Sequence, residues 1–357
     1  MGPALGFLLL VLSIIGLAGC AAPEEPWVDP YYLRGSAEEQ GLLEEYFILL
    51  SGERRGSKEQ LAVIQQIANT YLRQEEYQVL IRFLSQMIHD TAEDPQADQS
   101  YNTYYRFMKA FAHQQMGALP MAALYFDMIV KNYPDLNIQG NSIHLACLLQ
   151  LITLVEDGRQ RVWYYEELIS RFIDQIDPAP TYFLLGQAYE SIGEWNSAIR
   201  AYTQFLSFGP SHVTGFPNAH NYTRHLIDFH NSPKDWTFES LPALVAAVQS
   251  ALDAGSATRL WQYHARVNFF TRTWDDSTVG SAGHIAPHLA DFMRRSRIRY
   301  SDNLEINSNA NEAFLRTWGW SEHFSTWYLY FRKVQYPMNP DIHGRWEWAG
   351  IYYGDRF

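Results

Sequence analysis

The carboxyl-terminal region is dense in aromatic side chains that could bind a ligand. Tryptophan, tyrosine and phenylalanine recur from residue 314 to the end of the 357-residue chain. Rings placed beside arginine and carboxylate groups hold sugar rings or the side chains of a partner by stacking. Trp318, Trp320, Trp346 and Trp348 are therefore candidates for a ligand surface. Core filling is the alternative, because a strand with two faces buries at least one of them.

A basic run precedes this region and could complete such a surface. Arg297 and Arg299 are two residues apart, so they point to the same face of a strand. Guanidinium groups can bind a carboxylate or a phosphate in bidentate fashion. The alternative is a solvated sheet edge, where the arginines pair with nearby acids such as Asp302 and Glu305. Nucleic acid is not expected as a partner, because a net charge of −12 opposes the encounter.

The histidines do not form a metal-binding pattern. His284 and His288 are four residues apart, but Pro287 lies between them and no third ligand follows at a suitable spacing. The histidines of residues 212–230 lie in a predicted connecting segment, where solvated loop side chains are expected. We therefore predict no metal and no cofactor.

The sequence carries acid and base groups but no recognisable catalytic motif. The spacings of zinc proteases, serine hydrolases, phosphate loops and redox dithiols do not occur in it. Carboxylates such as Asp275, Asp276 and Glu347, and the pair Glu322 and His323, lie in the aromatic region. Two carboxylates about 5 to 10 Å apart across a pocket would suit glycoside hydrolysis. We assign no catalytic residue and favour a protein that is not an enzyme, with glycan hydrolysis as the alternative.

The amino terminus has the features of an export signal. Residues 5–19 are apolar, short for a membrane span, and end in Leu17-Ala18-Gly19-Cys20. This ending resembles the lipobox of bacterial lipoproteins, which implies that residues 1–19 are removed and that Cys20 carries acyl chains such as palmitate. No Lys or Arg precedes the apolar run, which leaves an uncleaved anchor helix as the alternative. The resemblance implies a bacterial cell-envelope protein, held to a membrane through Cys20 and facing the periplasm or the exterior.

The residues after this signal predict a tether. Residues 20–36 are rich in Pro, Glu and Gly, which oppose regular structure. The other cysteine, Cys147, lies in an apolar stretch and is expected to be a buried, inert thiol.

Residues 179–212 have the pattern of a helical hairpin. Apolar and small residues recur at helical spacing up to Gly193, which breaks the first helix, and then up to Pro210, which closes the second. The residues that predict the packing are Tyr182, Leu185, Gly186, Tyr189, Ala198, Tyr202, Phe205 and Pro210. Their spacing resembles one complete tetratricopeptide repeat, a unit of about 34 residues made of two antiparallel helices.

Three further hairpins precede this one. Their crossing residues are Ala68, Ala110 and Ile152, which are evenly spaced, and the last step to Gly186 is shorter than the two before it. We predict tetratricopeptide-like repeats over residues 37–212, stacked as a right-handed superhelix whose concave face binds a partner protein. Lys109 departs from the pattern, because it stands where the repeat would carry a leucine.

An aromatic-rich domain at residues 237–357 follows a connector at residues 213–236. We expect two helices, an extended run, a third helix, and strands at 297–306, 312–320, 326–334 and 345–353. In the third strand, Trp327 and Leu329 share one face while Tyr328 and Tyr330 share the other. This order is similar to nuclear-transport-factor-2-like domains, in which a curved sheet wraps helices around a pocket. A plain α+β domain with an antiparallel sheet is the alternative.

The predicted fold class is therefore mainly α, with a tetratricopeptide-like superhelix followed by a smaller α+β domain that has an antiparallel sheet. The function is interpreted as a membrane-anchored scaffold that binds an unknown protein through its repeats and carries a second binding surface in its last domain. The alternative is glycan or small-molecule binding by that domain, with hydrolysis as a variant of it.

Overall fold

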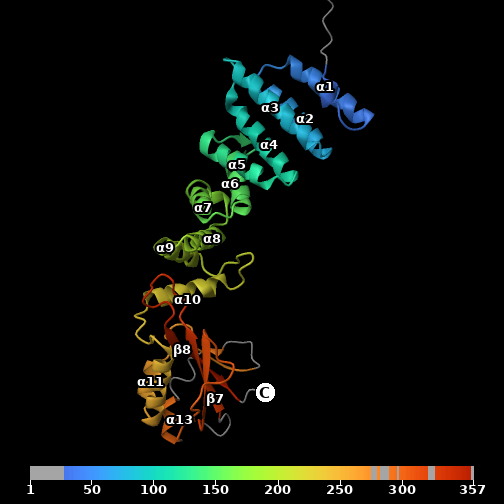
Figure 1. Cartoon of the computed structure of the whole chain (residues 1–357). Helices are drawn as coiled ribbons and strands as arrows, with labels where there is room; N and C mark the ends of the chain where they lie inside the picture. Colours follow the sequence, from blue (N-terminus) through green and yellow to red (C-terminus); the bar gives the residue numbers. More distant parts are fainter. Residues whose placement is uncertain (1–27, 275–279, 282–288, 296, 321–325, 355–357) are drawn as a thin grey trace, which may run out of the picture. The chain divides into compact units, whose positions relative to one another are not determined.

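The computed structural model describes residues 28–274, 280–281, 289–295, 297–320 and 326–354 (Figure 1). The predictions for the signal peptide, for Cys20 and for the start of the tether lie outside these residues. The chain divides into two compact units, Met1–Val155 and Glu156–Phe357. The division falls within the segment predicted as a hairpin with Ile152 at its crossing. The domain boundaries proposed from the sequence stay a prediction.

The first unit is a series of helices in which each packs on the next along the chain. A short two-stranded ladder, β1 (Asn137–Ile138) and β2 (Asn141–Ser142), joins the last two helices. Two 3-10 turns, Pro30–Tyr32 and Gln99–Tyr101, precede the first and fourth helices. The helices are α1 (Ala37–Gly52), α2 (Lys58–Arg73), α3 (Tyr77–Glu93), α4 (Asn102–Gln115), α5 (Leu119–Asn132) and α6 (Ile143–Leu154).

Local sequence explains where the helices of this unit begin and turn. Ser36 and Glu39 form a capping box, in which the backbone N–H of Ser36 donates to Glu39 Oε2 at 2.8 Å. These hydrogen bonds lower the pKa of the Glu39 carboxyl, because they favour its charged form. Glu75 and Gly117 adopt positive φ angles of 58° and 76°, which end α2 and α4 in tight turns. The predicted hairpins over α2/α3 and α4/α5 are confirmed as helix pairs.

The second unit begins with helices of the same kind. Helix α7 packs on α8, α8 on α9 and α9 on α10, and the turn between α8 and α9 contains Gly193 at a φ of 77°. The remaining helices belong to the aromatic-rich region. The bounds are α7 (Gly158–Phe172), α8 (Pro178–Ser191), α9 (Trp195–Ser207), α10 (Ala219–Asn231), α11 (Leu241–Asp253), α12 (Ala257–Gln262) and α13 (Leu289–Arg295), with a 3-10 turn at Ile173–Gln175.

A six-stranded sheet in the order β4-β3-β8-β7-β6-β5 completes the unit. Its strands are β3 (Phe270–Thr273), β4 (Gly280–Ser281), β5 (Arg299–Tyr300), β6 (Glu312–Trp318), β7 (Thr326–Lys333) and β8 (Trp346–Tyr353). Neighbours are antiparallel except β3 and β8, which run parallel with Phe270 opposite Gly350. The fold class, helical hairpins followed by a small α+β domain, is confirmed. The predicted antiparallel sheet is observed over β5 to β8, and the distant segment β3 adds to it as a parallel strand.

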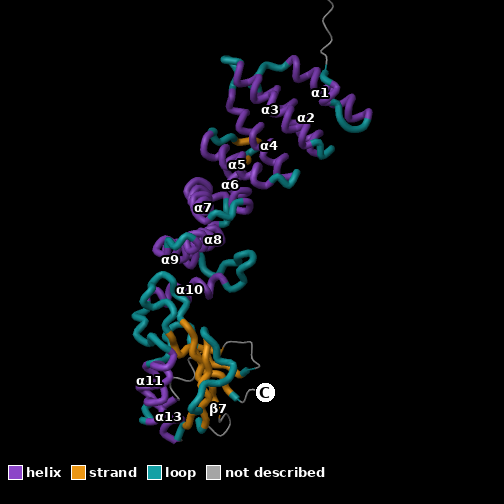
Figure 2. Tube along the Cα trace, in the orientation of Figure 1, coloured by secondary structure: helices purple, strands orange, loops and turns teal. Residues whose placement is uncertain are grey.

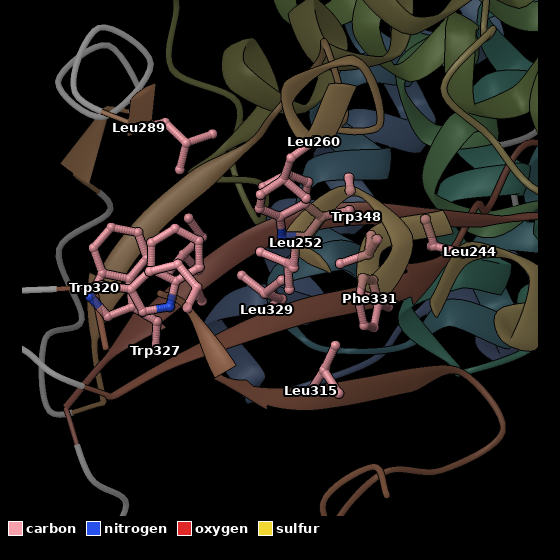
Figure 3. Close-up of a cluster of buried hydrophobic side chains, with 14 of the residues drawn as sticks. Leu244, Leu252, Leu260, Leu289, Leu315, Trp320, Trp327, Leu329, Phe331 and Trp348 are labelled. Atoms are coloured by element: carbon pink, nitrogen blue, oxygen red, sulfur yellow. The ribbon is translucent and has the colours of Figure 1, made fainter. Parts of the chain in front are cut away.

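Helices α11, α12 and α13 supply the apolar residues that cover one face of this sheet (Figures 1 and 2). Leu244 of α11 and Leu260 of α12 pack in one cluster with Leu315, Leu329 and other residues of the sheet (Figure 3). Burial of this apolar surface is the main force that holds helices and sheet together. The element order expected from the sequence is observed, and the resemblance to nuclear-transport-factor-2-like domains stays a prediction.

The strand predicted at residues 297–306 is shorter than expected. Only Arg299–Tyr300 forms a ladder with β6. Beyond it the chain bends and follows β6 through single backbone hydrogen bonds, from Ser301 N to Arg316 O and from Glu305 N to Phe314 O, each 2.9 Å. None of the helices within the described residues is long and apolar enough to cross a membrane.

Candidate functional site

The structure places most of the predicted tryptophan surface in the hydrophobic core. Trp320, Trp346 and Trp348 are 1%, 7% and 0% exposed. Trp320 stacks on Trp327, with ring centroids 4.3 Å apart and planes 5° from parallel (Figure 3). The indole N–H of Trp348 donates to Gly350 O at 2.9 Å. These three side chains therefore fill the core instead of forming an exposed surface, and ligand binding by them stays a prediction.

The fourth tryptophan lies beside one of the predicted arginines. Trp318 is half-buried at the end of β6 and is the cross-strand partner of Arg299 on β5. Arg297 and Arg299 are both exposed. At the edge of the sheet the structure thus brings together Trp318 and Arg299 of the predicted ligand set. Exposed charges at a sheet edge also discourage pairing with another sheet.

The sheet face opposite the helices carries a second aromatic cluster. Phe270, Phe314, Tyr328 and Tyr352 are buried together there, and they come from four different strands. The Arg272 guanidinium lies 4.7 Å from the Phe270 ring centroid and 4.8 Å from that of Tyr352, and it donates a hydrogen bond to the Tyr352 hydroxyl. The alternation in β7 predicted from the sequence is confirmed, since Trp327 and Leu329 face the helices while Tyr328 faces this cluster.

A buried carboxylate ties this sheet to the segment that precedes α11. Glu347 is 3% exposed and accepts two hydrogen bonds of 2.8 Å, from the indole N–H of Trp236 and from Nε of Arg332. A buried carboxylate is tolerated only where its charge is paired in this way. The role of Glu347 in the structure is thus to hold two segments together, and its oxygens are already bonded.

Sequence reasoning missed a cavity of about 420 Å³ beside α12 and α13. Its walls include Trp261, His264 and Arg266. The Trp261 and His264 rings stack 3.9 Å apart, and burial lowers the pKa of His264, so its neutral form is favoured. The sequence signal for this cavity is the spacing of its side chains: His264 follows Trp261 by three residues, and Arg266 follows His264 by two. This spacing fits no ligand-binding motif.

The remaining chemical candidates do not assemble into a centre among the residues that the structure describes. No group of three or more metal-ligating side chains occurs within 28–274, 280–281, 289–295, 297–320 and 326–354. His284, His288, Asp275, Asp276 and the pair Glu322 and His323 lie outside the described residues. Cys147 is fully buried, and burial raises the pKa of its thiol, as expected for an inert side chain.

The α8/α9 hairpin is packed through small residues at the point where its helices cross. A Cβ atom on Gly186 would lie 2.5 Å from Cε1 of Tyr202, closer than real atoms approach. Ala198 and Tyr202 are 1% and 0% exposed. On one side of the hairpin the rings of Phe183 of α8 and Phe205 of α9 pack with centroids 5.3 Å apart, and Ala219 of α10 is buried in the same cluster. The helices can approach this closely because the sequence puts glycine and alanine where they meet.

The other side of the hairpin is an open groove of about 580 Å³. Its floor is apolar and nearly buried, with Leu185 and Ala201 at 6% and 5% exposed. Tyr189 forms part of a wall, and its hydroxyl donates to Glu166 of α7. The lining residues are Tyr182, Leu185 and Tyr189 of α8 and Ser197, Arg200, Ala201, Thr203 and Gln204 of α9.

Comparison with known families identifies this hairpin. Residues 181–207 match the tetratricopeptide repeat. No curated protein matches the chain in sequence. Tetratricopeptide repeats generally mediate contacts between proteins, so the match indicates an interaction role for this part of the chain.

The tetratricopeptide hairpin also holds a half-buried carboxyl at its edge with α10. The Tyr222 hydroxyl lies 3.1 and 3.3 Å from the two oxygens of Glu190, to which it donates. Burial raises the pKa of the Glu190 carboxyl, while the hydroxyls of Tyr202 and Tyr222 lower it in part. Burial together with the Glu190 charge raises the pKa of Tyr222 to about 12. This contact fixes α10 against the repeat, and it leaves the groove on the opposite side free.

Proposed function

We propose that the protein is a scaffold that binds another protein through its tetratricopeptide hairpins. The match at residues 181–207 carries this proposal. A second observation supports it, because hairpins in the two units have the same layout. The small crossing residue precedes the turn glycine by the same number of residues in both, Ala110 before Gly117 and Gly186 before Gly193. Stacked hairpins of this kind create extended concave surfaces for binding a partner.

We further propose that the scaffold is held to a membrane of a bacterial envelope through acyl chains on Cys20. The support is the sequence Leu17-Ala18-Gly19-Cys20 after an apolar run. Two or three acyl chains suffice for firm anchoring, because each buried methylene contributes about 0.8 kcal/mol. The part of the predicted tether that precedes Tyr32 would let the folded units stand away from the bilayer, whereas Tyr32 itself packs on Phe47 of α1 and Phe83 of α3.

A second binding surface in the aromatic-rich domain is the alternative function. The observation that favours it is the 420 Å³ cavity, in which the ring of Trp261 lies beside the ionisable groups of His264 and Arg266. An aromatic wall with nearby polar groups suits a glycan or another small molecule.

A site-specific crosslinker in the full chain tests the scaffold proposal. A photoreactive benzoylphenylalanine replaces Gln204, which is exposed beside the groove, and as the matched control it replaces Glu239, which is exposed just before α11. We expect one defined protein adduct from position 204 only. The adduct is identified by mass spectrometry, and its binding is then measured with two purified proteins. The same adducts at both positions, or no binding between the purified proteins, would refute the scaffold.

Membrane anchoring is tested separately by mass spectrometry of the mature protein and by fractionation of the envelope. We expect an amino terminus at Cys20 that carries acyl chains, and release of the protein from the membrane fraction in Cys20→Ser. An intact Met1 with an unmodified cysteine would contradict the anchor without affecting the scaffold.

A further inference from the structure

Three hairpins of the chain share one register and can be compared residue by residue. One constant offset in residue number relates α2/α3 to α4/α5, and a second relates α4/α5 to α8/α9. These offsets superpose the turn residues Glu75, Gly117 and Gly193, whose φ angles are 58°, 76° and 77°. Matching turns mean that equivalent side chains on the helices occupy equivalent places.

In the first two of these hairpins an aromatic ring of the second helix packs on a ring of the first. Phe83 packs against Tyr71, with centroids 6.2 Å apart in an edge-to-face arrangement. At the equivalent positions of α4/α5, Tyr125 stacks on His113 at 5.3 Å with planes 9° from parallel. The side chain on the second helix thus fills the space between the two helices in both hairpins.

The α8/α9 hairpin keeps the first ring and lacks the second. Tyr189 is the equivalent of Tyr71 and His113, whereas Ala201 stands at the place of Phe83 and Tyr125. Among the residues that the structure describes, no aromatic ring forms a stacked or edge-to-face pair with Tyr189. The groove of about 580 Å³ lies over Ala201 as a consequence.

The walls of this groove suit a ring better than a polar group. At the equivalent place in α4/α5, Lys109 holds its ammonium 5.2 Å from the Tyr125 ring centroid, but in α8/α9 the same position is the aliphatic Leu185. The guanidinium of Arg200 lies at the exposed rim and bonds Ser197 Oγ at 2.9 Å. Within the described residues Arg200 makes no ion pair. An acidic residue next to the ring would therefore be complementary to the rim.

We propose that the groove over Ala201 binds an aromatic side chain of a partner protein, which stacks on Tyr189 in the place that the chain's own second ring occupies in α2/α3 and α4/α5. The inference rests on the proposed scaffold function and names the chemistry that the partner supplies. Aromatic anchors in largely desolvated pockets are the residues that dominate protein interfaces. The groove over Ala201 offers such a pocket with its apolar floor open.

N-acetyl-tyrosinamide is the probe for this proposal, titrated into the full chain and followed by methyl NMR signals of Leu185 and Ala201. We expect saturable shifts of both methyl signals with the tyrosine probe and none with N-acetyl-alaninamide. In Ala201→Phe the new ring occupies the groove, so the shift at Leu185 should weaken at least tenfold. Tyr189→Leu keeps the groove open but removes the stacking partner, so it should also weaken binding of the probe.

The reciprocal variant gives a matched control in the α4/α5 hairpin. Tyr125→Ala opens the equivalent space there and should leave probe binding at Leu185 unchanged. Absence of shifts in the wild-type chain, or equal shifts in Ala201→Phe, would overturn the groove proposal while the crosslinking result for the scaffold stands. A dimer that Ala201→Phe dissociates in sedimentation equilibrium would also overturn it, because the occupant would then be a second copy of the chain.

Discussion

Gly186 lies directly under the ring of Tyr202 where α8 crosses α9. Three ring atoms of Tyr202 would stand 2.5 to 2.8 Å from a Cβ atom at this position. The Tyr202 side chain is fully buried, so it cannot turn aside into solvent. The distance between the two helices of the tetratricopeptide hairpin is therefore set by the absence of a side chain at one residue.

Gly186→Ala should destabilise the hairpin. Overpacking of a buried contact typically costs about 1 to 3 kcal/mol, while the better helix propensity of alanine returns up to about 1 kcal/mol. We expect a net loss of about 1 to 2 kcal/mol in the free energy of unfolding, measured by urea denaturation. Gly41→Ala in α1 is the control, since nothing lies within 4 Å of its Cβ position and it should stabilise the chain. An equal gain in both variants would show that the helices separate without cost.

The ion pair between Arg332 and Glu347 should contribute more to the free energy of unfolding than exposed ion pairs of the same unit do. Arg332→Met would leave the carboxylate of Glu347, which is 3% exposed, without its cation and should cost about 3 to 5 kcal/mol. The double variant with Glu347→Met should recover part of this loss, because no charge stays buried, while the buried indole N–H of Trp236 loses its acceptor. Asp235→Asn is the control, since its ion pair with Arg266 at 2.9 Å is about half exposed and should contribute less than about 1 kcal/mol. Similar costs for the buried and exposed pairs in urea denaturation would contradict this.

Cys147 should be protected from thiol reagents in the folded chain. Its side chain is fully buried, so a reagent does not reach the sulfur in the folded chain. Burial also raises the pKa of the thiol, so little of it is in the reactive thiolate form. Labelling with iodoacetamide at pH 8 should be slow in native buffer and complete in 6 M guanidinium, as counted by peptide mass spectrometry. Cys147→Ser is the control that identifies the labelled position. Rapid labelling of the native chain would mean that α6 opens readily.

Much of the helical architecture could be predicted because its signals are local. Gly193 marks the turn of the α8/α9 hairpin and Pro210 marks its end. The helical spacing of Tyr182, Leu185 and Tyr189 shows which face of α8 is apolar. The alternation of side chains in β7 could also be predicted, because one face of that strand packs on the helices and the other packs on the aromatic cluster around Tyr328.

The burial of Trp320, Trp346 and Trp348 could not be predicted, because burial in the sheet depends on segments that are distant in the sequence. Strand β8 is buried on nearly every residue, so alternation does not say which way Trp346 and Trp348 point. Trp320 follows Gly319, whose φ of 89° ends β6, and its indole then stacks on Trp327. The parallel pairing of β3 with β8 joins segments that lie far apart in the chain, with β4 to β7 between them, and no local pattern encodes it.

The pH dependence of stability should reveal the half-buried carboxyl of Glu190. Its pKa is raised above the ordinary value of 4.5, chiefly by burial, so the folded chain holds the proton more tightly than the unfolded chain does. The corresponding stabilisation is complete below pH 4.5 and is lost as the pH rises through the pKa of the folded state. Glu190→Gln stays neutral at every pH and does not suffer this loss.

The free energy of unfolding of Glu190→Gln, relative to the wild-type chain, should therefore increase between pH 4 and pH 7. The increase should be modest, because the carboxyl is only partly buried and solvent screens it. Urea denaturation at each pH measures the difference, and Glu239→Gln controls for the loss of an exposed charge. A relative stability that falls as the pH rises would mean that the hydroxyls of Tyr202 and Tyr222 outweigh burial, so that the ionised carboxylate is the favoured form.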